Sequence, residues 1–262
     1  MITQYFRPTT LDEAIQLLAK PNTRPLGGGT VLNQRSDESF AVVDLQALGL
    51  DKIHKSGGKL EIGATATLSL LLENAYIPAA LAAAIRLEAP LNLRNIGTVA
   101  GALAACDGRS PFAAVMLALD AKVIFVPDNE QITLGNYLPL RVGAGLVPAR
   151  GGRPQGSPLQ SQLITKIEIP LNVKLAYESV ARTPADKPIV CAALAQWDSG
   201  RTRLVLGGWG ASPSVAMDGN EASGVEAAAR NAAHDAADEW ASAEYRSEVA
   251  AVLAKRCLEH LQ

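Results

Sequence analysis

The chain has little of what metal centres and disulfide frameworks are made from. Its 262 residues include three histidines and three cysteines, Cys106, Cys191 and Cys257. The cysteines are far apart, odd in number and never in a C-x-x-C pair, which argues against zinc, iron–sulfur and disulfide frameworks. The histidines are isolated, and no H-E-x-x-H or G-x-S-x-G stretch is present. We therefore expect no metal site, no Ser-His-Asp catalysis and three reduced, mostly buried thiols.

Long apolar runs and blocks of basic charge are also missing. No apolar stretch reaches the roughly 18 residues that a membrane-spanning helix needs. Residues 1–20 lack the basic-then-apolar layout of a signal peptide. The net charge is −2, from 24 basic and 26 acidic residues, and no basic run is interleaved with aromatic residues. We therefore expect a cytoplasmic protein that binds neither membranes nor nucleic acid.

The composition that remains is that of a folded chain, with 48% hydrophobic and 19% charged residues. Helix starts are predicted at Thr9 or Thr10, at Thr67 or Ser69, at Pro78 and at Ser110, where polar caps or prolines precede apolar periodicity. Strands are predicted at residues 41–48, 59–67, 122–127 and 163–171, followed by successive strands over 175–217 and helices at about 223–237 and 243–260.

This order of elements predicts an α+β protein. The larger part covers residues 1–171, with lobes at 1–55 and 56–171, and a smaller part of antiparallel strands plus helices covers 172–262. Residues 144–162 are rich in Gly, Pro, Arg and Gln and favour a long exposed loop or insertion. Three arginines in or near it, Arg141, Arg150 and Arg153, are either solvated or an anion site.

The stretch "RPLGGGTVLN", residues 24–33, contains three consecutive glycines, whose backbone is not covered by side chains. Consecutive glycines let backbone N–H groups converge into a concavity that binds anions, and the hydroxyl of Thr30 adds a donor. The pattern is neither G-x-x-x-x-G-K-[ST] nor G-x-G-x-x-G. Judged by itself, the loop is either a turn or a phosphate site.

A second stretch, residues 93–121, reads as a loop dense in small residues between two helices. Small residues permit close approach of a ligand and equally permit tight helix packing, so both readings stay open. The residues that can bring backbone or polar groups near a ligand are Arg94, Asn95, Gly97, Thr98, Gly101, Gly108 and Ser110.

Seven ordered segments together resemble the FAD-binding medium subunit, or middle domain, of the molybdenum hydroxylases. That family includes xanthine dehydrogenase, aldehyde oxidase and carbon monoxide dehydrogenase. The segments are "FRPTTLDEAIQLLA", "PLGGGTVL", "LRNIGTVAGALA" with "LALDAKV" after it, "LITKIEIP", "YESVARTPADKPIVCAAL", "LVLGGWGASP" and "SAEYRSEVAAVLAKR". The resemblance covers nearly the whole chain.

The resemblance implies a two-lobed FAD-binding domain of the PCMH type and a C-terminal domain that covers the flavin. It also implies partners, a molybdopterin-binding large subunit and a [2Fe-2S] small subunit, with electrons passing through FAD to NAD or another acceptor. The chemistry would be the flavin's, and the chain alone would hydroxylate no substrate. The residues implied to line the FAD site are Leu26, Gly27, Gly28, Gly29, Thr30, Val31, Asn95, Ile96, Gly97, Thr98, Gly101, Asp107 and Lys187.

The sequence departs from the family pattern at three positions, Val31, Ala102 and Pro111, each of which lacks a usual polar side chain. At about 0.5–1.5 kcal/mol per hydrogen bond, their loss weakens binding by roughly two to three decades. Asp107 and Arg109 either compensate, by accepting from a ribose hydroxyl and pairing with a phosphate, or are a turn and a solvated side chain.

Two alternatives stay open, of which the first is favoured by Ala102, Pro111 and the insertion at 144–162. One is a structural or assembly subunit of the same fold with weakened or lost FAD binding. The other is a stand-alone flavin reductase, which would need a nicotinamide pocket for which the sequence offers no motif.

Overall fold

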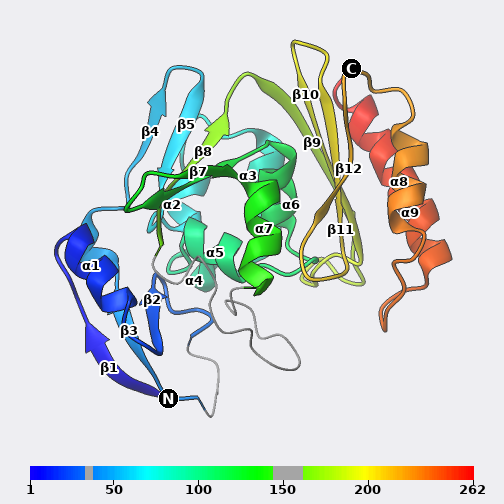
Figure 1. Ribbon diagram of the computed structural model, residues 1–262. Helices are drawn as coiled ribbons and strands as arrows, with labels where there is room; N and C mark the ends of the chain where they lie inside the picture. Colours follow the sequence, from blue (N-terminus) through cyan, green and yellow to red (C-terminus); the bar gives the residue numbers. More distant parts are fainter. Residues whose placement is uncertain (33–37, 144–161) are drawn as a thin grey trace.

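The computed structural model describes residues 1–32, 38–143 and 162–262, and it contains three sheets with helices between and outside them (Figure 1). None of the helices in these residues has the length and apolarity required to cross a membrane. Helices and strands are mixed along the chain, and the α+β class is confirmed.

The first sheet is parallel, with the strand order β1-β3-β2. Helix α1 begins as predicted, because the Thr10 side chain accepts a hydrogen bond from the amide of Glu13. The predicted strand at 41–48 is shorter in the structure. It ends where the Asp44 carboxylate accepts the amide of Gln46 at 2.9 Å and turns the chain into a 3-10 helix. The elements are β1 (Ile2–Phe6), α1 (Leu11–Leu18), β2 (Thr23–Leu26), β3 (Phe40–Asp44) and the 3-10 helix Gln46–Leu48.

The second sheet is antiparallel and has the order β4-β5-β8-β6-β7. The predicted strand at 59–67 stops at Gly63, because the next residues leave the sheet and prepare a helix. Thr67, rather than Ser69, caps that helix by accepting the amide of Leu70 at 3.1 Å. The strands are β4 (Ile53–Ser56), β5 (Lys59–Gly63), β6 (Lys122–Val126), β7 (Gln131–Thr133) and β8 (Leu163–Pro170).

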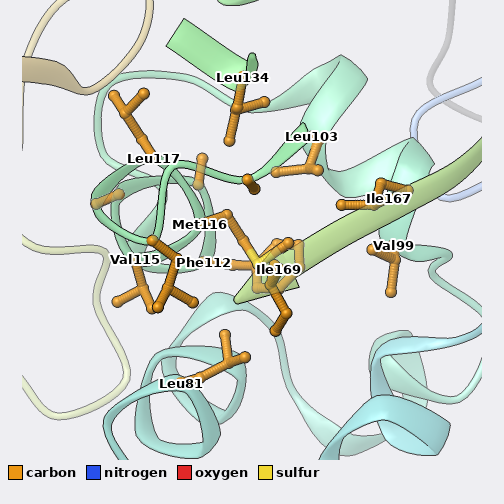
Figure 2. Close-up of a cluster of buried hydrophobic side chains, with 14 of the residues drawn as sticks. Leu81, Val99, Leu103, Phe112, Val115, Met116, Leu117, Leu134, Ile167 and Ile169 are labelled. Carbon is orange, nitrogen blue, oxygen red and sulfur yellow. The ribbon is translucent and has the colours of Figure 1, made fainter. Parts of the chain in front are cut away.

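In the described part of the chain, six helices connect the strands of this sheet, and α6 is buried along its whole length. Pro111 occupies its first turn, and the buried Ser110 hydroxyl caps it by accepting the amide of Ala113. Figure 2 shows Phe112 and Met116 of α6 in one apolar cluster with Leu81 of α3 and Ile169 of β8. The helices are α2 (Leu68–Leu72), α3 (Ala79–Glu88), α4 (Leu91–Arg94), α5 (Val99–Ala105), α6 (Pro111–Ala118) and α7 (Leu134–Gly143).

The third sheet is antiparallel, has the order β12-β11-β10-β9, and is covered on both faces. Alternate residues of β10 face α6 on one side and helices α8 and α9 on the other, which explains its run of small apolar residues. The elements are β9 (Val173–Val180), β10 (Val190–Trp197), β11 (Thr202–Gly207), β12 (Ser214–Gly219), α8 (Val225–Ala233) and α9 (Ala243–Glu259).

The hydrophobic core is continuous from the second sheet into the third. Ile167 of β8, Phe112 of α6 and Ala193 of β10 belong to one buried cluster, and the faces of α8 and α9 form a second. The division at residue 171/172 therefore stays a prediction, since the two parts share packed side chains across it.

Two expectations from the sequence are corrected. The stretch after residue 90 is not one loop, because α4 and α5 form within it. Arg141 is neither solvated nor an open anion site. It is fully buried and donates to the carbonyls of Ala104 (3.0 Å) and Ala211 (2.8 Å). The predicted loop at 144–162, with Arg150 and Arg153, lies outside the described residues except for Gln162.

All three cysteines are free and buried, as expected from their scarcity and separation. Burial raises the pKa of the Cys106 and Cys191 thiols to about 12, because the thiolate form loses its hydration. Such thiols are poor nucleophiles, so the cysteines serve packing rather than chemistry.

Candidate functional site

The glycine loop follows directly on β2, at the edge of the N-terminal sheet. Gly29 has a φ of 71°, in the left-handed region that favours glycine. The side chain of Gln46 donates to the carbonyl of Gly27 at 3.0 Å and holds the start of the loop. The loop is therefore a defined turn whose shape depends on residues without side chains.

The two glycine-bearing stretches pack directly against each other. A Cβ atom on Gly28 would overlap the carbonyl oxygen of Ile96, and one on Gly27 would lie 2.6 Å from the Thr98 hydroxyl oxygen. Thr30 and Gly97 also approach each other across this contact. The bare backbone of the loop is thus required for close packing, which brings Gly27–Thr30 and residues 95–98 into one place.

The glycine loop carries backbone amides that, in the described part of the chain, donate no hydrogen bond. Within the residues that the structure describes, the amides of Gly28, Gly29 and Thr30 have no hydrogen-bond partner. The amides of Asn95, Ile96 and Gly97, in contrast, donate to carbonyls of Leu91 and Leu93 in helix α4. Free and half-buried amides in a turn are donors suited to an anion.

Thr98 and Gly101 have an evident local role at the start of α5. The buried Thr98 hydroxyl accepts the amide of Gly101 at 3.1 Å and caps the helix. Asn95 lies three residues before Thr98, and its side-chain oxygen Oδ1 accepts a hydrogen bond from the hydroxyl of Ser69 at 2.6 Å. That bond leaves the exposed Asn95 amide group, in the described part of the chain, available as a further donor.

Apolar side chains flank these donors. Val31 is 45% exposed and Ile96 is 49% exposed, and each belongs to one of the two touching loops. Leu26, at the end of β2, is half-buried. Polar backbone groups beside exposed apolar side chains are the usual lining of a site for an organic ligand.

Asp107 and Lys187 form a second cluster at the other end of α5. The Lys187 ammonium lies 2.9 Å from the Asp107 carboxylate, although 80 residues separate them. The Arg109 guanidinium is not simply solvated, which corrects one of the two expectations for this side chain. Its guanidinium donates to the carbonyls of Lys187 (2.6 Å) and Pro188 (3.0 Å) and lies over the ring of Trp240.

Gly108 joins the same cluster to the C-terminal sheet. Its amide donates to Gly210, and its carbonyl accepts from Gly208 at 2.6 Å. A Cβ on Gly108 would overlap the carbonyl of Trp209. Helix α5 has seven residues and so rises about 10 Å, and in the chain it lies between residues 95–98 and Asp107.

Glu88 lies beneath this second cluster. Its carboxylate accepts from the Ser110 hydroxyl (2.7 Å) and from the Phe112 amide (3.1 Å) at the start of α6. Burial raises the pKa of Glu88, and these two hydrogen bonds oppose that rise. A buried carboxyl thus supports the helix that carries the cluster.

Sequence reasoning did not identify Gln46, Ser69, Glu88 or Trp240 as parts of this region. Each acts on a partner 19 or more residues away, so no local pattern marks it. In the described residues no group of three or more His, Cys, Asp or Glu side chains is placed to hold a metal ion.

The chain is similar to known proteins in both sequence and structure. The protein YgfM of Escherichia coli K12, described as uncharacterized, is 29% identical over 263 residues, covering 97% of this chain and 94% of YgfM. The glyceraldehyde dehydrogenase medium chain of Sulfolobus acidocaldarius is 27% identical over 229 residues, covering 82% and 78%. Reconstituted CO dehydrogenase from Oligotropha carboxidovorans is similar in structure, with a TM-score of 0.77, 25% identity and coverage of 98% and 96%.

The family described as "FAD binding domain in molybdopterin dehydrogenase" matches residues 1–172, about two thirds of the chain, which include both glycine-bearing stretches. The sequence resemblance is thereby confirmed: the chain belongs to this family and is an FAD-binding oxidoreductase subunit of the molybdenum hydroxylase type.

Proposed function

We propose that this chain receives electrons from [2Fe-2S] clusters on a small partner subunit and passes them through FAD to NAD or another acceptor. A large partner would carry the molybdopterin and the hydroxylation site, and we expect no hydroxylation by this chain alone. The three separated cysteines support this division, since one iron–sulfur cluster commonly takes four thiolates. A cytoplasmic location stays a prediction.

The observation that carries the proposal is the set of free amides on Gly28, Gly29 and Thr30. We assign them, with the side-chain amide of Asn95, to the pyrophosphate of FAD. A dianion needs converging donors and no formal positive charge, because several amide dipoles together stabilise it. The residues present therefore fit the cofactor at this end of the site.

Asp107 and Lys187 would serve the other end. When bound, FAD supplies the redox chemistry by taking up and releasing electrons singly or in pairs. We propose that the Lys187 ammonium stabilises negative charge on the reduced flavin and that Asp107 accepts from a hydroxyl of the cofactor or holds the lysine. Leu26, Val31 and Ile96 would exclude water from the site, while Thr98, Gly97 and Gly101 keep the second loop close to the first.

The alternative is a structural or assembly subunit that holds FAD weakly or not at all. It is favoured by Ala102 and Pro111, which bring no polar group, and by the use of Thr98 and Ser110 as helix caps. It is opposed by the free amides of the glycine loop, which packing alone does not satisfy.

Visible absorption of the purified chain, before and after addition of FAD, separates the two proposals. A bound-flavin spectrum with saturable uptake is expected if the glycine loop holds the pyrophosphate. A colourless protein that takes up no added FAD would leave the structural subunit as the better account.

The acceptor is tested on the FAD-loaded chain, reduced without oxygen and mixed with NAD⁺. If NAD is the acceptor, the flavin absorbance returns while NADH absorbance appears in equal amount. Flavin that stays reduced with NAD⁺ but is reoxidised by a quinone or oxygen would assign a different acceptor.

A further inference from the structure

We propose that Arg109 is a positioning residue of the flavin site, which holds the β9–β10 loop against Trp240 and so fixes the Lys187 ammonium. The inference rests on the proposed function, because it concerns the lysine assigned there to the reduced flavin. Nothing in the local sequence marks Arg109 for this role, since the carbonyls that its guanidinium binds lie 78 or more residues away.

Arg109 binds two successive backbone carbonyls, that of Lys187 itself and that of the next residue, Pro188. One arm of the guanidinium donates to the Lys187 carbonyl at 2.6 Å, and Nε donates to the Pro188 carbonyl at 3.0 Å. The planar fork of arginine can make both bonds at once, whereas the single ammonium of a lysine at this position cannot reproduce the geometry. The contact therefore sets the direction in which residue 187 leaves the loop.

Trp240 is the platform for this contact, with the guanidinium of Arg109 4.4 Å from its ring centre. The guanidinium of Arg182, from the β9–β10 loop itself, also lies 4.4 Å from that ring centre. The indole of Trp240 thus contacts both Arg182 of the loop and Arg109, which binds the loop backbone. Cation–π contacts of this kind restrict both arginines without using their hydrogen-bond donors.

The platform is anchored to the buried Arg246 of α9. Asp238 accepts the amide of Trp240 at 2.8 Å and pairs with Arg246 through both carboxylate oxygens at 2.8 Å. Arg246 is fully buried and also donates to the carbonyl of Ile189, where the loop rejoins β10. Arg246 therefore binds both the end of the β9–β10 loop, at Ile189, and the segment that carries Trp240, through Asp238.

The Asp107–Lys187 pair does not hold the loop by itself. Its side chains are 50% and 42% exposed, and exposed ion pairs contribute little because solvent screens them and both side chains lose freedom. Charged hydrogen bonds to two carbonyls are stronger and act on the backbone directly. The lysine is then free to exchange Asp107 for another negative group without losing its place.

The test measures the reduction potential of bound FAD in R109K, which keeps the charge and loses the fork. We expect the potential to fall in R109K and also in R109A, because a mispositioned lysine stabilises the reduced flavin less. A tenfold weaker hold on the reduced form corresponds to about 30 mV for a two-electron couple. W240L should shift the potential in the same direction. R256K, an exposed arginine on α9, is the matched control and should leave it unchanged.

K187M decides whether Arg109 acts through the lysine. K187M should lower the potential by itself, and R109K added to K187M should lower it no further. Additive shifts would mean that Arg109 acts independently of Lys187 and would overturn the inference. Hydrogen exchange of residues 181–189 in the flavin-free chain should rise in R109K and stay unchanged in R256K.

The two failures are distinguishable. A wild-type chain that takes up no FAD overturns the proposed function, and this inference with it. A chain that binds FAD with the same potential in the wild type and R109K overturns only the positioning role.

Discussion

Two glycines allow the close backbone contacts on which the candidate site depends. Gly28 has no room for a Cβ because the carbonyl of Ile96 occupies that space, and Gly108 has none because of Trp209. Both positions bring two backbones into direct contact, which only glycine allows without displacement. At this scale the glycines decide the geometry, while the polar groups on the surrounding backbone decide the chemistry.

A G28A substitution is expected to abolish or strongly weaken FAD retention. The added methyl must displace the Ile96 backbone, so the loop that carries the free amides moves. The cost to stability should be about 1–3 kcal/mol, as for other overpacked positions. Flavin content by absorbance and unfolding by circular dichroism measure the two effects.

G219A is the matched control, because a Cβ there would meet nothing within 4 Å. It should keep the flavin content of the wild type. Full flavin content in G28A would contradict the assignment of this loop to the pyrophosphate.

At the scale of elements, α6 organises the molecule. All eight of its residues are buried, since it packs against α3 and against strands β10 and β11 of the third sheet. Its start carries Ser110 and, just before that, the Asp107–Arg109 cluster. A helix with no exposed face is set in direction by its neighbours on every side, and it transmits that position to the loop at its start.

F112A should destabilise the fold by about 3–5 kcal/mol, because a fully buried ring is replaced by a cavity. V252A on α9, where the side chain is 47% exposed, is the control and should change stability by less than about 1 kcal/mol. Denaturant unfolding followed by circular dichroism measures both. A cost for F112A as small as that of the control would mean that the core around α6 is loosely packed.

At the scale of the whole molecule, ion pairs as well as the shared core join residues 1–171 to residues 172–262. Arg201 and Arg203 of the β10–β11 region bind Asp218 of β12 and also Asp120, which follows α6. The two arginines hold the pKa of Asp218 at about 2, below its ordinary value of 3.8. The network fastens the end of α6 to the third sheet, opposite the end that carries Asp107.

D218N should cost about 1–2 kcal/mol at neutral pH. The figure follows from a downward shift of almost two pKa units at about 1.36 kcal/mol each, reduced because the side chain is 30% exposed. A lowered carboxyl pKa adds stability above pH 3.8, and that stability is lost as the pH falls toward 2. The difference between wild type and D218N should therefore shrink over that range in urea unfolding. A difference independent of pH would contradict this origin.

A fragment of residues 1–172 should not fold stably on its own. Removing the third sheet and its helices exposes the face of α6 that packs on β10 and β11. Size-exclusion chromatography and circular dichroism of the fragment should show aggregation or a non-cooperative transition. A monomeric fragment that unfolds cooperatively would show instead that the first 172 residues form an independent core.

Local features were predictable where the cause is local. The caps at Thr10, Thr67 and Ser110 follow from side chains that bond amides three residues on, and such bonds depend little on the rest of the chain. The predicted strand ends were less accurate, at residues 45–48 and 64–67. The turn at Asp44 is a local bond to the Gln46 amide, which the apolar run of residues 41–48 concealed. The chain path at Gly63 depends instead on the backbone of Leu50 and Lys52, which lies more than ten residues away.

The sequence by itself determined the fold class and the family, because helix caps, apolar periodicity and glycine-bearing segments are written in short windows of residues. Only the tertiary structure decided that Gly28 meets Ile96, that Asp107 meets Lys187 and that Arg109 holds a loop against Trp240. These partners are between 68 and 131 positions apart in the chain, and no local pattern reports a distance that arises only when separate elements pack.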